Sequence, residues 1–396
     1  MRVLPLLLLP LAACAQVSIS TDFEGGSLGR IEKVSETHFK GAVVGQADQD
    51  NRNRQPSWYY FRIDGAKGRE VTVTLTDLIG EYNYKPGALC VRADIPPVVS
   101  SDGKTWRHLD KIVVENDEAT IRVTPDSDEF WVAHIEPYTT SRLERFLDEI
   151  RGHPDLQIDV IGKSVQGRNL YVLRLASAAG ASDDGMRPRI WLMCRQHAWE
   201  TGTSFVGEGA IRYLLSPEGE KLRATFNIRI FPMLDPDGCA QGGIRFNRNG
   251  YDLNRNWDTA DPDSEASRKL MPEICAAKKI LRAAQGFFLT LHNQETGEWL
   301  SSTLRNRDVA ARFFAKLCDR TTFSPSEPGP RPPSAASAAG RATVYEYLEG
   351  QGMNAFLLEQ GITKSPKLGR QATSQDRREF GAQLIQVMAD VAARGK

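Results

Sequence analysis

The sequence has no excess of either charge, no apolar run long enough to cross a bilayer, and no pattern of paired cysteines. Lysine plus arginine and aspartate plus glutamate number 50 each, so there is no overall basic field to hold nucleic acid or an anionic membrane. The five cysteines after Cys14 are odd in number and widely spaced, without a Cys-x-x-Cys motif. Neither nucleic acid nor a disulfide framework is therefore implied.

Residues 1–15 differ in composition from the rest of the chain. Val3–Leu11 is apolar apart from two prolines, and small residues follow it. This pattern predicts a short export signal, because so brief a run cannot span a bilayer. Ala13-Cys14-Ala15 fits a small-x-small cleavage site, whereas Leu11-Ala12-Ala13-Cys14 resembles a bacterial lipobox, which would place a lipid anchor on Cys14. We expect an exported protein, either periplasmic or an outer-membrane lipoprotein.

The segment from Val17 to His134 contains short β patterns separated by turn pairs such as Asp-Gly and Pro-Gly. This predicts an antiparallel β-sandwich as an N-terminal domain, residues 16–138. Ser141 and Glu144 then fit a capping box at the start of an amphipathic helix. We expect this helix to open a second domain, residues 139–396.

In the second domain, apolar runs typical of buried strands alternate with helical patterns. The strand candidates are Leu156–Ile161, Leu170–Leu175, Ile190–Cys194, Asn227–Leu234, Phe287–Leu291 and Asn354–Leu358. Alternation of strands and helices favours the α/β class, with a mixed, largely parallel sheet flanked by helices.

His197 and Glu200 come directly after the apolar run Ile190–Cys194, and a helical pattern follows them. They therefore lie at a strand-to-helix turn, where α/β sheets bind ligands. An imidazole and a carboxylate suit zinc. The same spacing recurs at His292 and Glu295, so a turn histidine with a solvated glutamate is an alternative for either pair.

Other polar residues also follow buried strands. His292 and Glu359 each end an apolar run, and a loop after another strand holds Arg245, Asn254 and Arg255. If the strands are parallel, these groups meet at one sheet edge. His292 would be a third zinc ligand, leaving a position for water, with Glu359 as its base. Arg245 suits an oxyanion, and Asn254 with Arg255 suits a carboxylate. Read singly, each residue is compatible with a purely structural or solvated role.

The ordered set His197-x-x-Glu200, Asp252-Leu253-Asn254-Arg255-Asn256-Trp257, His292 and Asn354–Glu359 resembles the zinc metallocarboxypeptidases. The preceding β-rich segment, with Trp58–Arg62, Ser101–Trp106 and Pro137–Thr139, looks like the extra domain of the cytosolic carboxypeptidase-like branch. The resemblance covers nearly everything after the leader, and its most specific piece is Asp252–Trp257.

This resemblance implies a carboxypeptidase-like fold and one Zn²⁺ per chain, held by His197, Glu200 and His292. It also implies that Glu359 activates the attacking water and later shuttles its proton, and that Arg245 polarises the scissile carbonyl.

On the substrate side, the resemblance implies that Asn254 and Arg255 hold the terminal carboxylate of a peptide or protein. Arg341 falls near the segment that forms the specificity pocket in relatives, so a preference for acidic C-terminal residues is a hypothesis.

Two departures from the family stand out. Thr322–Val344 contains no tyrosine, and the branch name implies the cytosol whereas the leader implies export. Glu295 has no counterpart role.

The sequence thus predicts a zinc metallocarboxypeptidase that hydrolyses C-terminal residues by a metal-activated water. Two alternatives stay open: a peptidase or amidase of peptidoglycan stem peptides, which export would suit, and a non-catalytic zinc-binding protein of the same fold. The presence of Glu359 argues against the last, because loss of the base is the usual mark of such a protein.

Overall fold

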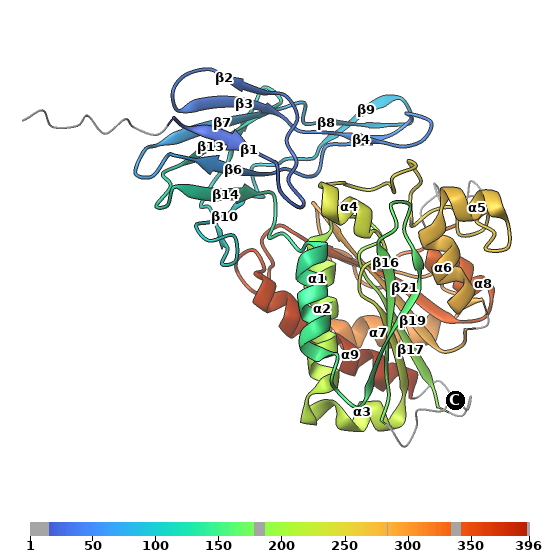
Figure 1. The fold of residues 1–396 in the computed structure, drawn as a ribbon. Helices are drawn as coiled ribbons and strands as arrows, with labels where there is room; N and C mark the ends of the chain where they lie inside the picture. The colour runs from blue at the N-terminus through green and yellow to red at the C-terminus, as the bar shows by residue number, and fades with distance from the viewer. Residues whose placement is uncertain (1–15, 178–186, 283, 334–341, 394–396) are drawn as a thin grey trace, which may run out of the picture.

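The computed structural model describes residues 16–177, 187–282, 284–333 and 342–393 (Figure 1). The predicted export signal with Cys14, and Arg341, lie outside these ranges. Within them, none of the helices combines the length and the apolar character that crossing a bilayer requires.

Two five-stranded sheets form most of the N-terminal part of the molecule. The first has the order β1(Ser18–Ser20), β6(Tyr60–Asp64), β14(Glu129–Ala133), β10(Val98–Ser100), β11(Arg107–His108). The second has the order β12(Val113–Glu115), β13(Glu118–Val123), β7(Val71–Thr76), β3(His38–Ala42), β2(Ile31–Lys33). Alternate side chains from both, such as Phe61 and Val73, form one apolar core. The predicted sandwich is confirmed, with one parallel pair, β3 and β7.

A smaller four-stranded sheet extends from this sandwich over the second part of the molecule (Figure 1). We call it the arm; its strands are β4(Gln46–Ala47), β5(Arg54–Gln55), β8(Ile79–Tyr82) and β9(Lys85–Leu89). Asn83 and Tyr84 join β8 to β9 with φ values of 51° and 61°, the left-handed conformation of a tight hairpin turn.

The second part is built on a seven-stranded sheet. Its order is β15(Leu156–Lys163), β16(Asn169–Leu175), β18(Asn227–Phe231), β17(Arg189–Met193), β19(Phe287–Gln294), β21(Asn354–Gly361), β20(Trp299–Ser301). The four strands from β18 to β21 are parallel, whereas β15, β16 and β20 pair antiparallel. The predicted mixed α/β sheet is therefore confirmed, and its parallel centre places the strand ends on one edge.

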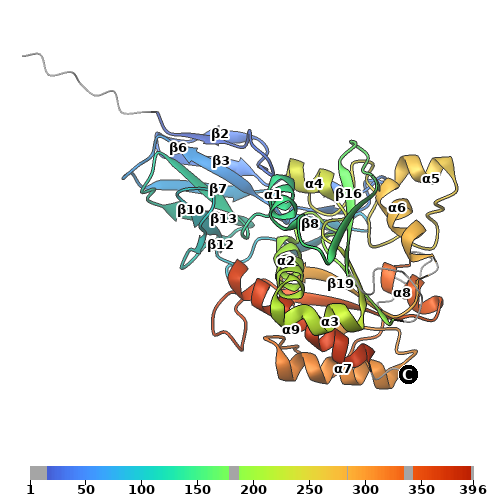
Figure 2. The same ribbon diagram turned by 60° about the horizontal axis from the view of Figure 1, so that its bottom comes forward.

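Helices cover both faces of this sheet (Figure 2). One apolar cluster joins it to α1(Thr140–Ile150), α2(Thr201–Leu215), α7(Arg307–Arg320) and α9(Ser374–Ala392). A second cluster joins it to α6(Pro272–Leu281) and α8(Val344–Gly350), beside α5(Glu265–Leu270). The short helices α3(Glu220–Thr225) and α4(Pro236–Gln241) lie at the bottom and near the top of this part in Figure 1. Along β17, Leu192 faces the first cluster and Trp191 the second, as the two-residue period of a strand requires.

The predicted capping box at Ser141 is wrong. Thr139 is the N-cap of α1, and its side chain accepts a hydrogen bond from Arg142 N. The N–H of Ser141 instead donates to Glu24 of the sandwich, 3.0 Å away. Besides the N-cap Thr139, a residue 117 positions before Ser141 thus accepts a hydrogen bond from the first turn, which no local pattern could indicate.

Candidate metal centre

The turn between β17 and α2 carries the first predicted ligands and is shaped by Arg195. This residue adopts the left-handed conformation, with φ at 58°, and only 2% of its surface is exposed. Its guanidinium donates to Ala198 O at 2.9 and 2.6 Å and to Tyr138 O at 3.0 Å. The turn is therefore folded back on a buried cation, which brings His197 and Glu200 to the same side.

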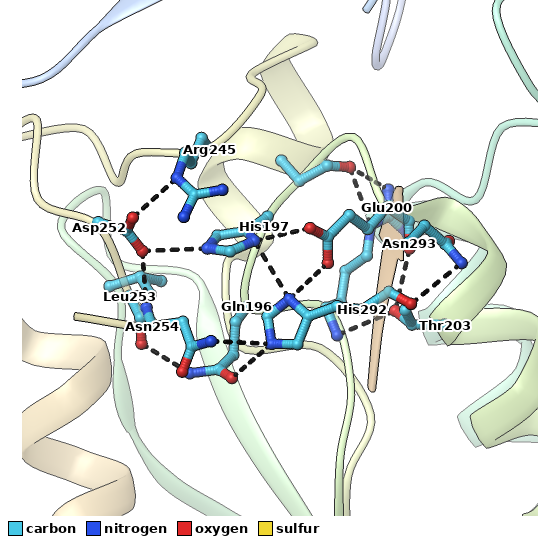
Figure 3. Close-up of polar contacts among 12 residues, drawn as sticks. Gln196, His197, Glu200, Thr203, Arg245, Asp252, Leu253, Asn254, His292 and Asn293 are labelled. Atoms are coloured by element: carbon cyan, nitrogen blue, oxygen red, sulfur yellow. Dashed lines mark hydrogen bonds and ion pairs between the residues drawn. The ribbon is translucent and has the colours of Figure 1, made fainter. Parts of the chain in front are cut away.

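His197, Glu200 and His292 point toward a common centre (Figure 3). His197 Nδ1 lies 2.7 Å from Glu200 Oε1 and 3.2 Å from His292 Nδ1. His292 Nδ1 lies 2.9 Å from Glu200 Oε2. The structure therefore brings together the three predicted ligands, with one donor atom of each facing the others.

The second nitrogen of each ring is held from outside this cluster. Asp252 Oδ1 lies 3.0 Å from His197 Nε2, and Gln196 Oε1 lies 3.2 Å from His292 Nε2. Because Asp252 Oδ1 accepts hydrogen bonds, it favours a proton on Nε2 of His197 and leaves the lone pair on Nδ1. His292 Nε2 faces both Gln196 Oε1 and the amide nitrogen of Asn254. Such outer partners commonly orient metal-binding histidines.

The charge of this cluster suits a cation. Burial opposes ionisation of Glu200, but His197 and His292 outweigh it and hold the pKa of this carboxyl below its ordinary value. Three lone-pair donors this close repel one another unless a positive charge lies between them. Two imidazoles and a carboxylate are the donor set of catalytic zinc sites, so these residues fit zinc.

Asp252 also binds Arg245, the residue predicted to stabilise an oxyanion. Its Oδ2 accepts from Arg245 Nε at 2.7 Å while its Oδ1 faces His197 (Figure 3). Phe246 and Asp252 form an antiparallel bridge, so Arg245 and Asp252 lie on the two sides of one hairpin. The guanidinium is thereby fixed next to the ligand cluster.

Glu359 lies on β21, directly opposite His292 of β19 in the parallel register. Its Oε2 is buried without a hydrogen-bond partner. Burial raises its pKa well above the ordinary value, and the negative charges of Glu200 and Glu295 add to this, against Arg245 and Arg255. A carboxyl whose affinity for protons is raised beside a metal-binding cluster can accept and return a proton near neutral pH.

The two predicted carboxylate-binding residues are placed differently. Asn254 is 2% exposed; its Nδ2 lies 3.2 Å from His292 Nε2, and its Oδ1 accepts from Val344 N at 3.2 Å. Arg255 is half-buried, donates to Asn254 O, and lines a cavity of about 240 Å³. Arg255 therefore faces open space, whereas Asn254 faces His292, a predicted ligand. Tyr345 is buried in the core, 3% exposed.

The cavity lies between the arm and the candidate metal centre. Most of the residues that line it are of polar types, and they come from both parts of the chain: Asp48, Gln49, Arg52, Asn53, Gln55, Tyr82 and Asn83 on one side, and Arg245, Phe246, Asp252, Arg255 and Asn256 on the other. The N-terminal part thus contributes directly to the surroundings of the site.

Sequence reasoning missed Arg195, Gln196 and Asp252. Arg195 and Gln196 immediately precede His197, but nothing in their type indicates that they are buried. Asp252 opens the motif that carried the family resemblance, and an acidic residue in a conspicuous motif is a usable signal for a partner of a histidine ligand. Glu295, left without a role, accepts a hydrogen bond from Ser57 at 3.3 Å.

Comparisons with known proteins agree with this geometry. The family model described as zinc carboxypeptidase matches residues 143–301, and the one described as cytosolic carboxypeptidase N-terminal domain matches residues 19–135. A Zymomonas mobilis protein is 26% identical over 283 residues, covering 70% of this chain and 68% of that protein. Cytosolic carboxypeptidase 6 of Caenorhabditis elegans is 30% identical over 279 residues, 65% of this chain and 57% of that protein.

Solved structures with the same fold include two bacterial enzymes. A metallo-carboxypeptidase from Burkholderia cenocepacia superposes with a TM-score of 0.82 at 20% identity, covering 96% of this chain and 99% of that one. A metallo-carboxypeptidase from Pseudomonas aeruginosa gives 0.80 at 20% identity, covering 95% and 99%. At this identity the likeness shows the fold alone. The two family models, and not this likeness, identify the family: residues 143–301 belong to the zinc carboxypeptidase family, and residues 19–135 match the N-terminal domain of the cytosolic carboxypeptidases.

Proposed function

We propose that this protein is a zinc-dependent carboxypeptidase that hydrolyses C-terminal residues from peptides or proteins. The observation that carries the proposal is the convergence of His197 Nδ1, Glu200 and His292 Nδ1 on one centre beside the carboxyl of Glu359. A structural zinc site is closed by four protein ligands, whereas three ligands with an acid alongside are typical of a hydrolytic site.

Each polar residue then has a distinct task. A zinc ion bound by His197, Glu200 and His292 would supply a Lewis acid that increases the acidity of water. Glu359 takes the proton from the attacking water and returns it to the leaving amine, which its raised proton affinity permits. Arg245, fixed by Asp252, donates to the oxygen of the scissile carbonyl as negative charge develops there.

Arg255 is the residue proposed to bind the terminal carboxylate of the substrate, because it lines the cavity next to Arg245. Asn254 would assist it only after turning its amide away from His292 and Val344. A preference for acidic C-terminal residues, suggested by Arg341, stays a hypothesis. Equal cleavage of peptides ending in acidic and apolar residues would remove it.

Export also remains a proposal, supported by the leader pattern of residues 1–15. Cell fractionation with mass spectrometry of the mature N-terminus would separate the cleaved form from a lipid anchor at Cys14. A full-length protein that stays in the cytosol would contradict both.

The activity is tested by zinc analysis together with mass spectrometry of a peptide library before and after incubation. We expect stoichiometric zinc and peptides shortened by one C-terminal residue at a time. The Glu359→Ala variant should retain zinc and lose turnover. Stoichiometric zinc without hydrolysis of any peptide by the wild type would indicate a binding protein instead.

A further inference from the structure

The backbone of Arg245 is held by a side chain from the arm. The N–H groups of Ile244, Arg245 and Phe246 all donate to Gln46 Oε1, at 2.9, 2.7 and 3.0 Å. Gln46 Nε2 in turn donates to Phe246 O at 2.6 Å. A single amide from β4 thus satisfies four backbone groups about 200 residues further along the chain.

Three successive N–H groups that converge on one point form a concave site that ordinarily surrounds an anion. Here a neutral amide oxygen fills it. Ile244 and Phe246 are 1% and 2% exposed, so without Gln46 their N–H groups would lie buried and unpaired, which is unfavourable. The segment therefore keeps this conformation only while the arm is docked.

The opposite side of the same segment meets the metal-binding turn. Ile244 O accepts a hydrogen bond from Trp199 N at 3.0 Å, one residue before Glu200. The backbone that carries Arg245 is consequently fixed between the arm and the turn that carries two of the ligands.

The arm meets the Arg245–Asp252 hairpin at a second point. Gln49 N donates to Gly250 O at 3.1 Å. Gly250 has φ at 83°, and a Cβ there would come 2.6 Å from Gln49 N, so glycine permits this close approach. Two contacts from one short stretch of the arm thus hold the start and the tip of the hairpin.

We propose that Gln46 is a positioning residue for Arg245, so that the N-terminal part of the chain completes the catalytic site. This inference rests on the proposed role of Arg245 in polarising the scissile carbonyl. Since that interaction strengthens as charge develops in the transition state, a displaced Arg245 should lower kcat more than it raises KM. Displacements of about 1 Å can cost about 100-fold in rate.

The test compares three variants for kcat, KM, zinc content, thermal unfolding and amide hydrogen exchange at residues 244–246. Gln46→Ala removes all four hydrogen bonds. Gln46→Glu keeps an oxygen that can accept from the three N–H groups, but it replaces the donor to Phe246 O with a second oxygen that the carbonyl repels. Glu24→Ala is the matched control, because the Glu24 side chain also joins the sandwich to the second part of the chain, but it does so at Thr140 and Ser141 and not at residues 244–246.

For Gln46→Ala we expect kcat to fall about 10- to 100-fold, with KM changing less than about threefold and zinc retained. Exchange of the amide protons of residues 244–246 should accelerate. Gln46→Glu should lose less kcat than Gln46→Ala, and Glu24→Ala should stay within about twofold of the wild type.

Unchanged kcat and unchanged exchange in Gln46→Ala would overturn the inference, as would an equal loss of kcat in Glu24→Ala. If Gln46→Ala does not fold, Gln46→Glu decides: slow amide exchange with kcat above one tenth of the wild type supports the inference, and fast exchange with full kcat contradicts it. A wild type without peptidase activity would instead refute the proposed function, which the same assay reveals first.

Discussion

The chain contains the spacing His-x-x-Glu twice, and the histidine and glutamate side chains face each other in only one of the two copies. In the first, His197 and Glu200 lie in an irregular turn and face each other across 2.7 Å. In the second, His292 lies inside β19, which continues to Gln294. Glu295 lies one residue beyond the end of this strand and accepts a hydrogen bond from Ser57. In this chain, the same spacing brings the two side chains together only where the backbone turns.

The N-terminal part of the chain touches both copies. His134 stacks on Trp199 of the first copy, with ring centroids 6.2 Å apart, and its Nδ1 lies 2.7 Å from Ser57 O. The hydroxyl of the same Ser57 donates to Glu295 of the second copy. The sandwich thus supports the metal-binding turn by packing and the other glutamate by a hydrogen bond.

The largest contrast is expected between the two glutamates. Zinc binding at structural protein sites is worth roughly 10 to 16 kcal/mol in total, so loss of one ligand in three should weaken it by about 300- to 8,000-fold. Glu200→Ala should therefore lose zinc and activity, whereas Glu295→Ala should bind zinc like the wild type. Competition with a chromogenic chelator measures both. Comparable zinc loss in the two variants would contradict the assignment of ligands.

The pH dependence of the free energy of unfolding tests whether His134 is held uncharged against Trp199. Burial lowers the pKa of His134 from 6.5 to about 4. A depressed folded-state pKa gives stability that is present above pH 6.5 and is lost as pH falls toward 4, up to about 3 kcal/mol. His134→Phe, which keeps an aromatic ring against Trp199, should flatten this dependence. Urea unfolding of zinc-free protein between pH 4 and 7 tests it; identical slopes in both proteins would refute it.

The partners of the two histidines offer the next comparison. Asp252 faces His197 with a carboxylate, whereas Gln196 faces His292 with a neutral amide. Asp252→Asn should lower zinc affinity about 10- to 100-fold, because the charged partner raises the basicity of the ring. Gln196→Ala should have a smaller effect. Titration calorimetry with zinc would show a reversed order if the charge of Asp252 were unimportant.

The smallest effect is expected at Glu295 in catalysis. Burial is the main cause of the raised pKa of Glu295, and the negative charge of Glu295 raises the pKa of Glu359. Glu295→Gln should therefore lower the pKa of Glu359 and shift the acidic limb of the kcat/KM profile to lower pH, with the maximum within about twofold of the wild type. An unshifted acidic limb would show that the two carboxyls do not interact.

Much of the fold and of the candidate site could be predicted because several of the candidate site residues follow apolar runs that are recognisable as strands. His292 and Glu359 stand after apolar runs that form neighbouring parallel strands, so a periodicity argument places them side by side. The α/β class and the sandwich followed from the same patterns. The zinc-ligand roles, like those of Arg245 and Arg255, stay predictions with a consistent geometry.

What could not be predicted depends on contacts between distant segments. Arg195 looks like a surface residue until the turn closes over its guanidinium. The amide of Asn254 is turned toward His292 partly because Val344 N, at the start of α8, holds its oxygen. Gln46 lies about 200 residues from the hairpin that it holds. In each case the decisive partner comes from tertiary structure, which local spacing does not encode.

The most direct test is anomalous diffraction at the zinc edge from crystals grown with zinc. One peak is expected, within about 2.0–2.2 Å of His197 Nδ1, a Glu200 oxygen and His292 Nδ1. No peak at these three atoms, or a metal held by Glu295 in place of Glu200, would contradict the account.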